Sequence, residues 1–178
     1  MKATGIIRRI DELGRIVIPK EIRKSLRIKE GENLEIYVDK DENIVLRKHS
    51  LIKKINDFAQ DFADAVYSFI KHDFIIADND NILAVAGPLK KEYLNQNIST
   101  FLDSKINRRE EVLEKHKKSI SLVEDKNIEA TYAISPVIVN GDTVGCVLII
   151  GVDEPVDEVD LKIVQIASRF LNSHLEQW

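Results

Sequence analysis

Arginine and lysine side chains are concentrated at the start of the chain, although the protein as a whole is acidic. Residues 1–29 hold nine basic and three acidic side chains, whereas residues 51–178 hold fourteen basic and twenty-one acidic ones. Clustered guanidinium and ammonium groups suit a phosphate backbone, and arginine can also bind a guanine edge or enter a narrow minor groove. This asymmetry indicates a basic contact module on an acidic body, or alternatively an ordinary solvated charged face.

Short predicted elements position these basic side chains. Residues 3–10 (ATGIIRRI) and 15–18 (RIVI) are rich in β-branched residues and predict two strands joined by a turn at DELG. Pro19 suits the first turn of a helix, and a short helix is predicted over residues 20–26, with Ile22 and Leu26 on its buried side. The candidate contacts therefore lie on the first strand, just after the turn and on the helix: Arg8, Arg9, Arg15, Arg23 and Lys24.

Residues 33–49 show the alternation of a hairpin, with Leu34, Ile36 and Val38 on one face. Strand, strand, helix, strand and strand are thus predicted within about fifty residues, a size at which one copy buries little surface. Strand edges would also remain unpaired. We therefore expect two copies to interleave their strands, which would join their basic side chains into one surface about a two-fold axis.

The remainder predicts a second domain of antiparallel strands and helices. We expect a connecting helix over residues 51–72, packed on this domain and on a partner copy, or alternatively within its own chain only. Its apolar seam is Ile52, Ile55, Ala59, Phe62, Val66 and Phe69. A hairpin and a short helix are predicted over residues 74–95, and residues 98–126 are predicted to be helix or loop. A second hairpin turns at Asn140-Gly141.

A long amphipathic helix is predicted at the end of the chain, with Pro155 in its first turn. Its apolar stripe is Val156, Val159, Ile163, Ala167, Phe170, Leu171, His174, Leu175 and Trp178. These elements together predict an α+β fold in which helices pack on an antiparallel sheet.

No catalytic or metal-binding constellation emerges from the sequence, so we expect a protein that is not an enzyme and has no metal or cofactor. Cys146 lies in an apolar strand, where cysteines are usually buried and unreactive. The four histidines lack metal-ligand spacing. GPLKKEY lacks the spacing of a phosphate-binding loop, and Glu110-Glu111 lies in a charged, solvated segment.

The first forty-eight residues, above all GIIRRIDELGRIVIPKEIRKSL, resemble the N-terminal domain of AbrB-type transition-state regulators. That resemblance implies a swapped-hairpin fold in which two chains interleave and the equivalents of Arg8, Arg15, Arg23 and Lys24 face double-stranded DNA, with Arg9 in support. Some relatives have arginine where this chain has Lys24, and lysine lacks the planar fork, so Lys24 is expected to contact phosphate.

Two later stretches, FIIADNDNILAVAG and YAISPVIVNGDTVGCVLIIG, resemble the sheet hairpins of GAF-type sensor domains. The resemblances divide the chain into an AbrB-type domain (residues 1–50), a connecting helix (51–72) and a GAF-like regulatory and oligomerisation domain (73–178). The pairing resembles a family of sporulation regulators that activate some forespore genes and repress others. It implies a homodimer or a tetramer assembled through helices flanking the GAF-like domain, and an unidentified small-molecule ligand.

Two other functions are compatible with parts of the sequence. An antitoxin can carry a related swapped hairpin, but its toxin-binding tail is short and disordered before binding, whereas residues 51–178 look folded. The chain could also be a small-molecule sensor whose first module only mediates assembly. A single cysteine, no apolar run of membrane-spanning length and no signal peptide lead us to expect a cytoplasmic, nucleoid-associated protein that does not bind membranes.

Overall fold

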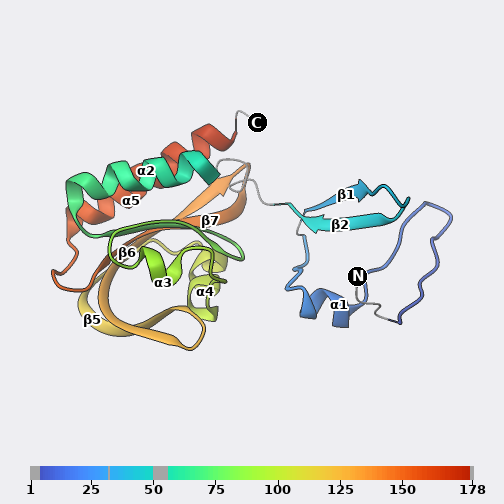
Figure 1. Cartoon of the computed structure of the whole chain (residues 1–178), viewed down its shortest axis with the longest axis horizontal. Helices are drawn as coiled ribbons and strands as arrows, with labels where there is room; N and C mark the ends of the chain where they lie inside the picture. The colour runs from blue at the N-terminus through green and yellow to red at the C-terminus, as the bar shows by residue number, and fades with distance from the viewer. Residues whose placement is uncertain (1–4, 32, 50–55, 177–178) are drawn as a thin grey trace. The chain divides into compact units, whose positions relative to one another are not determined.

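The computed structural model describes residues 5–31, 33–49 and 56–176, and the chain divides into two compact units, residues 1–49 and 50–178. The first unit contains helix α1 (Lys20–Ser25) and the antiparallel hairpin of β1 (Leu34–Val38) and β2 (Ile44–Lys48), as Figure 1 shows. The helix and the hairpin lie where the sequence predicts them. The Nζ atom of Lys48 donates to the carbonyl oxygen of Arg27 at 2.7 Å, which ties β2 to the segment after α1.

The first predicted hairpin is only partly formed within one chain. Its turn is present, because the Asp11 amide donates to the Arg15 carbonyl at 3.0 Å and the Gly14 amide donates to the Asp11 carbonyl at 2.9 Å. Gly14 adopts a φ of +75°, which glycine reaches without strain. Residues 5–10 and 15–18, however, belong to no strand in the described chain. A strand requires a hydrogen-bonded neighbour, and one chain does not supply it here.

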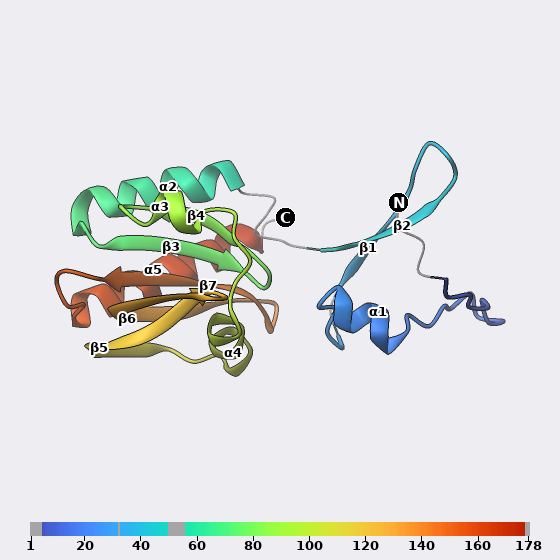
Figure 2. The same ribbon diagram turned by 60° about the horizontal axis from the view of Figure 1, so that its bottom comes forward.

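The second unit is built on a five-stranded antiparallel sheet with the order β4-β3-β7-β6-β5 (Figure 2). Its strands are β3 (Asp73–Asp78), β4 (Ile82–Ala86), β5 (Val112–Val123), β6 (Lys126–Val139) and β7 (Asp142–Gly151). The predicted turn at Asn140-Gly141 joins β6 to β7, and both of its residues have positive φ, 51° and 87°. The hairpin predicted around residue 80 is β3 and β4.

Helices cover both faces of this sheet (Figure 1). One face packs against α2 (Asn56–Ile70) and α5 (Glu158–Leu175), through residues such as Ala59, Ala63 and Leu171. The other face packs against α3 (Lys90–Tyr93) and α4 (Thr100–Arg108), through Tyr93 and Leu102 among others. The second unit is therefore a three-layer domain with two apolar cores.

Residues 98–126 differ from their prediction as helix or loop. Helix α4 occupies the first part, but residues 112–123 form β5, which pairs with β6 at the edge of the sheet. Residues 115–119 are all exposed, which explains their polar composition. Charged side chains are favoured on edge strands because they discourage pairing with other chains. The polar composition of residues 115–119 is therefore compatible with a strand that pairs with β6 on one side only.

The last helix confirms part of its predicted stripe, because Ala167, Leu171 and Leu175 are buried, but its buried face also includes residues outside that stripe. Asp160, Val164 and Ser168 are buried, whereas the predicted stripe members Val159 and Phe170 are exposed. The hydroxyl groups of Ser168 and Ser135 on β6 lie 2.9 Å apart, so a polar contact replaces apolar packing at the centre of this face. Phe58, Phe62, Phe170 and His174 instead form a ladder of stacked rings between α2 and α5. Trp178, Ile52 and Ile55 lie outside the described residues.

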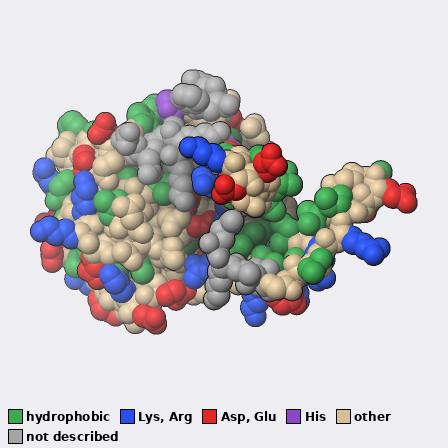
Figure 3. All heavy atoms as spheres, turned by 45° about the vertical axis from the view of Figure 1, so that its right-hand side comes forward, with side chains coloured by type: hydrophobic (Ala, Val, Ile, Leu, Met, Phe, Trp, Pro, Cys, Tyr) green, Lys and Arg blue, Asp and Glu red, His purple; other side chains and the backbone are tan. Residues whose placement is uncertain are grey.

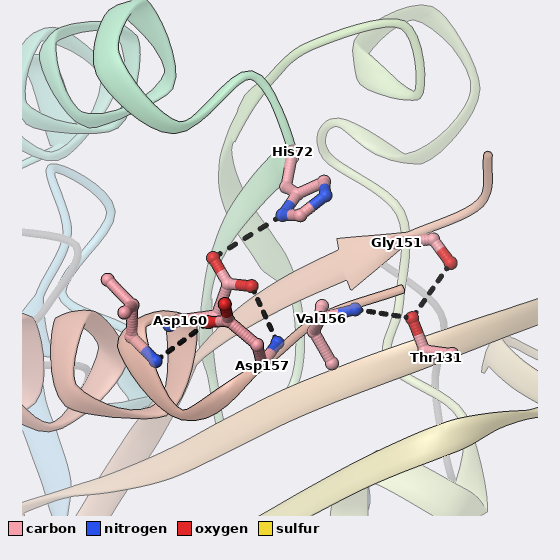
Figure 4. A network of polar contacts seen from close by, with 7 residues as sticks. His72, Thr131, Gly151, Val156, Asp157 and Asp160 are labelled. Atoms are coloured by element: carbon pink, nitrogen blue, oxygen red, sulfur yellow. Dashed lines mark hydrogen bonds and ion pairs between the residues drawn. The ribbon is translucent and has the colours of Figure 1, made fainter. Parts of the chain in front are cut away.

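Polar contacts fix the point where α5 begins (Figure 4). The Asp157 carboxylate accepts from the amide of Asp160 at 3.2 Å, and the Asp160 carboxylate accepts from the amide of Asp157 at 2.9 Å, which makes a capping box. The amide of Val159 also donates to the Asp157 carboxylate, at 2.7 Å. Asp160 also contacts the Nδ1 atom of His72 at 3.3 Å. Pro155, predicted in the first turn, therefore lies just before the helix.

Candidate nucleic-acid interface

The first unit places the predicted basic side chains at its surface. Arg8, Arg9, Arg15 and Lys24 are exposed, and Arg23 is half-buried. Arg8 and Arg9 lie in the extended segment before the turn, Arg15 ends the turn, and Arg23 and Lys24 lie in the last turn of α1. The space-filling view shows apolar side chains at the surface beside basic and acidic ones (Figure 3).

Arg15 is the most strongly oriented of these basic side chains. Its Nε atom donates to the Oδ2 atom of Asp11 at 2.7 Å, and its backbone amide donates to Oδ1 of the same carboxylate at 2.8 Å. The amide of Leu13 also donates to that Oδ1 atom, at 3.0 Å. Three donors thus converge on one carboxylate, and they hold both the turn and the guanidinium group.

The electrostatics of the turn follow from these contacts. Hydrogen bonds from the Arg15 backbone amide and the Arg15 guanidinium group hold the pKa of the Asp11 carboxyl below its usual range. Asp11 is therefore ionised at neutral pH, and the pair it forms with Arg15 persists there. The turn at DELG, which begins with Asp11, was predicted from the sequence. The contact between Asp11 and Arg15 was not predicted.

Apolar side chains of the first unit lack a core of their own. Among its described residues, Pro19 alone falls in the buried class. Val17, Ile36 and Val38 are each more than 70% exposed. Ile22 and Leu26 were predicted to share a buried side, but Ile22 is half-buried and Leu26 is exposed. The full set of large exposed apolar residues here is Ile6, Ile7, Ile10, Leu13, Ile16, Val17, Leu26, Ile36, Tyr37, Val38, Ile44 and Leu46. Monomeric soluble proteins rarely expose so much contiguous apolar surface.

The described residues of the second unit show neither a metal-binding cluster nor a reactive cysteine. In the described part of the chain, no group of three or more His, Cys, Asp or Glu side chains is arranged to hold a metal ion. Cys146 is fully buried, and burial raises the pKa of its thiol far above the usual range, so it is a poor nucleophile. None of the helices in the described residues is long and apolar enough to cross a membrane.

Comparison with known proteins identifies both parts of the chain. Residues 54–176 match the family described as "Stage V sporulation protein T C-terminal, transcription factor". Stage V sporulation protein T of Bacillus subtilis (strain 168) is 48% identical over 181 aligned residues, which cover 99% of this chain and all of that protein. The chain belongs to the stage V sporulation protein T family.

The first unit is also similar to domains of proteins outside this family. The transition state regulatory protein AbrB of Bacillus subtilis (strain 168) is 61% identical over 49 residues, which cover 28% of this chain and half of that protein. Residues 7–54 also match the family described as "Antidote-toxin recognition MazE, bacterial antitoxin". The predicted AbrB-type domain is thereby confirmed.

Solved structures confirm the GAF-like fold of the second unit. The GAF domain of the nutrient sensor CodY from Clostridium difficile has a TM-score of 0.52 at 12% identity, and covers 70% of this chain and 94% of that one. The GAF domain of a phosphoenolpyruvate-protein phosphotransferase from Acinetobacter has a TM-score of 0.55 at 12% identity, and covers 73% of this chain and 84% of that one. At these identities the likeness concerns the fold alone.

Proposed function

We propose that this protein regulates forespore genes, as activator of some and repressor of others, by binding double-stranded DNA as a homodimer through residues 1–50. The observation that carries the proposal is the composition of the first unit's surface, where basic side chains lie among apolar side chains that have no core. Membership of a family of sporulation transcription factors supports the same role. Residues 73–178 would then provide regulation and assembly, joined to the first unit through residues 51–72, and the protein would act on the nucleoid in the cytoplasm.

Dimerisation through the first unit follows from its exposed apolar surface. Burying an isoleucine, valine or leucine side chain contributes about 1.5–3 kcal/mol, and eleven such side chains are exposed among the described residues of the first unit. The segments before and after the Asp11–Arg15 turn also lack strand partners, whereas an interleaved second copy would supply both partners and core. This supports the swapped-hairpin arrangement, in which each chain completes the other.

The proposed DNA contacts are Arg8, Arg15, Arg23 and Lys24, with Arg9 in support. Two copies would double these charges about a two-fold axis, and release of counterions from the DNA would then provide much of the affinity. Arg23 differs from the others because its Nε atom is buried without a hydrogen-bond partner among the described residues. Its terminal nitrogens remain the groups through which we propose that it contacts DNA.

Assembly beyond the dimer is proposed through the outer surface of α2 and α5. Phe69 on α2 and Val159 and Ile166 on α5 are all more than 60% exposed, and the ring ladder ends there in Phe170, which is 44% exposed. Both helices pack on the same face of the sheet, so these exposed apolar side chains lie on one side of the second unit. A second copy of this surface is the partner that we propose, and it would make a tetramer of two dimers.

A small-molecule ligand is a weaker proposal for the second unit. A ligand between the sheet and α4 would lie in a layer already occupied by buried side chains of the chain itself, among them Ile98, Leu102, Ile106 and Leu148. Binding would therefore require these side chains to move, and we name no ligand.

The antitoxin alternative is less well supported. The antitoxin family matches only residues 7–54, and the rest of the chain is a folded domain that matches the sporulation family. A sensor that uses its first unit only for assembly would leave the exposed arginines without a role.

Replacement of Arg15 by alanine tests the DNA proposal. Since two copies each lose a charge-assisted contact, each worth about 1.5–3 kcal/mol, affinity for the preferred duplex should fall by about two orders of magnitude or more. The slope of log affinity against log salt should flatten by about 2. Fluorescence anisotropy over a salt series measures both quantities, and sedimentation should show unchanged assembly.

A matched control is Arg108→Ala, which removes an exposed arginine of the second unit that lies 3.5 Å from Glu110. It should leave both affinity and salt dependence unchanged. Equal losses in the two variants, or a wild-type affinity that barely responds to salt, would contradict the proposed DNA role.

A further inference from the structure

The first unit contains two turns with the same pattern of hydrogen bonds. In one, the Asp11 carboxylate accepts from the amides of Leu13 and Arg15, two and four residues later. In the other, the Asp39 carboxylate accepts from the amides of Asp41 and Asn43, again two and four residues later, both at 2.9 Å. The backbone bonds repeat as well, since Asp39 donates to Asn43 at 3.0 Å and Glu42 donates to Asp39 at 3.1 Å.

The two turns differ in the side chain that closes them. In the second turn, the amide nitrogen of the Asn43 side chain lies 3.1 and 3.2 Å from the two oxygens of Asp39, so its polar group is used inside the turn. In the first turn, the guanidinium group of Arg15 uses Nε alone to bind Asp11, at 2.7 Å. Its Nη1 and Nη2 atoms make no hydrogen bond or ion pair within the described residues, and its side chain is 71% exposed.

We propose that Asp11 is a positioning residue for DNA recognition, which holds Nε of Arg15 so that its two Nη groups face outward together. The inference rests on the proposed function, because it assigns the outward groups to DNA. The two terminal nitrogens are those with which arginine grips a phosphate or a guanine edge in a bidentate manner. A long side chain that is already oriented loses less conformational entropy when it binds.

The carboxylate also has an opposite effect, which makes the inference testable. A negative charge next to a DNA-binding surface repels phosphate, so neutralising Asp11 would strengthen binding if the residue only added charge. If Asp11 positions Arg15, the same neutralisation weakens binding. The sign of the change therefore decides between the two roles.

The test is Asp11→Asn in the full-length protein, measured with a fluorescein-labelled duplex selected from random sequence by the wild type. Asparagine keeps the Oδ1 acceptor for the two backbone amides but replaces the acceptor of Nε with a donor. We expect affinity to fall by about tenfold, from a modest loss at each of two sites. Asp39→Asn is the matched control, because it neutralises the equivalent aspartate of the turn closed by Asn43, and should leave affinity within about twofold.

The same substitution in an Arg15→Ala background separates positioning from folding. If Asp11 acts through Arg15, Asp11→Asn should have no further effect on affinity there, whereas a general disturbance of the turn would lower it again. Asp11→Ser, whose hydroxyl can also accept from turn amides, replaces Asp11→Asn if that variant fails to fold. If Asp11→Asn binds DNA as tightly as the wild type or more tightly, while Arg15→Ala still weakens binding, the inference is wrong. If Arg15→Ala does not weaken binding, the proposed function is wrong.

Discussion

The two units of this chain place their apolar side chains in opposite ways. In the second unit, two clusters lie on the two faces of one sheet, and residues such as Phe74, Leu102 and Leu148 are inaccessible to solvent. In the first unit, Pro19 is the sole described residue in the buried class, and its isoleucines and valines face outward. The second unit is thus complete within one chain, whereas the first has the elements of a fold without its core.

The same difference is seen in how strand edges are treated. The outer edge of β4 is covered by its own chain, because the Gln60 side chain donates to the Val85 carbonyl at 3.1 Å and accepts from the Val85 amide at 3.3 Å. The amide of Ile82 donates to the carbonyl of Gln96 at 2.8 Å. Residues 5–10 and 15–18 have no such neighbours in one chain. The proposed completion of these segments by a second copy would explain how so small a DNA-binding unit is stable.

The largest effect is expected from Ile36→Asp in the first unit. Ile36 is 71% exposed in one chain, so the charge would cost little there, but in an interleaved dimer it would enter the core twice. Loss of two buried isoleucines, at about 1.5–3 kcal/mol each, should raise the dissociation constant of this interface by about 10²–10⁴-fold. DNA binding should be lost with it.

Sedimentation equilibrium and anisotropy measure these changes, and circular dichroism should show the second unit still folded. Ile36→Val, which stays apolar, should retain both assembly and DNA binding. A stable, DNA-binding Ile36→Asp dimer would mean that the exposed apolar face is not the interface.

A smaller effect is expected from Phe170→Glu on α5. Phe170 packs against Phe62 with ring centroids 5.3 Å apart but remains 44% exposed, so only part of its surface is available to a partner. Association through the α2–α5 surface should weaken by about 10- to 100-fold, because half of an aromatic side chain is lost from each copy. Sedimentation velocity should then show dimers at concentrations where the wild type forms tetramers.

This variant sharpens the comparison because it should leave the first unit intact. DNA affinity per dimer should stay within about threefold of the wild type, in contrast to Ile36→Asp. Phe170→Leu is the conservative control and should preserve assembly. A wild type that is dimeric at all concentrations would remove the proposed tetramer.

The parts of the fold that follow from local sequence patterns were predicted in both units, and one strand without such a pattern was not. Alternation and turn chemistry are local properties, so they predicted the hairpins at residues 33–49 and at Asn140-Gly141. The β5 strand was missed because its exposed residues 115–119 carry no alternating pattern, although its partner β6 is the next strand in the sequence. Pairing energy does not appear in local composition.

The candidate site shows the same limit. The basic positions were predicted from residue type and family likeness, and they remain predictions as DNA contacts. The sequence did not reveal that the Asp11 carboxylate orients Arg15, because a search for basic residues does not consider an acidic side chain. Only the coordinates of its two oxygens, each with its own donors, distinguish a structural carboxylate from a solvated one.

The smallest effect is expected from Asp73→Asn in the second unit, and it depends on pH. Asp73 is almost fully buried at the start of β3, and loss of solvation raises the pKa of its carboxyl above the ordinary 3.8, although the Leu89 amide donates to it at 2.8 Å. The native state therefore binds more protons than the unfolded state between 3.8 and the raised pKa. Unfolding free energy contributed by this group is greatest below that window and falls as pH rises through it. Asparagine resembles the protonated form and keeps an acceptor for Leu89, so the variant should be more stable than the wild type at neutral pH and match it in acid.

Urea unfolding at several pH values measures the difference in unfolding free energy between the variant and the wild type. Glu129→Gln, which neutralises an exposed side chain on β6, is a control that should leave the pH profile unchanged. A variant less stable than the wild type at neutral pH would show that the ionised carboxylate stabilises this unit, and the contrast between a self-sufficient core and an unfinished one would then have to include a buried charge that the core requires.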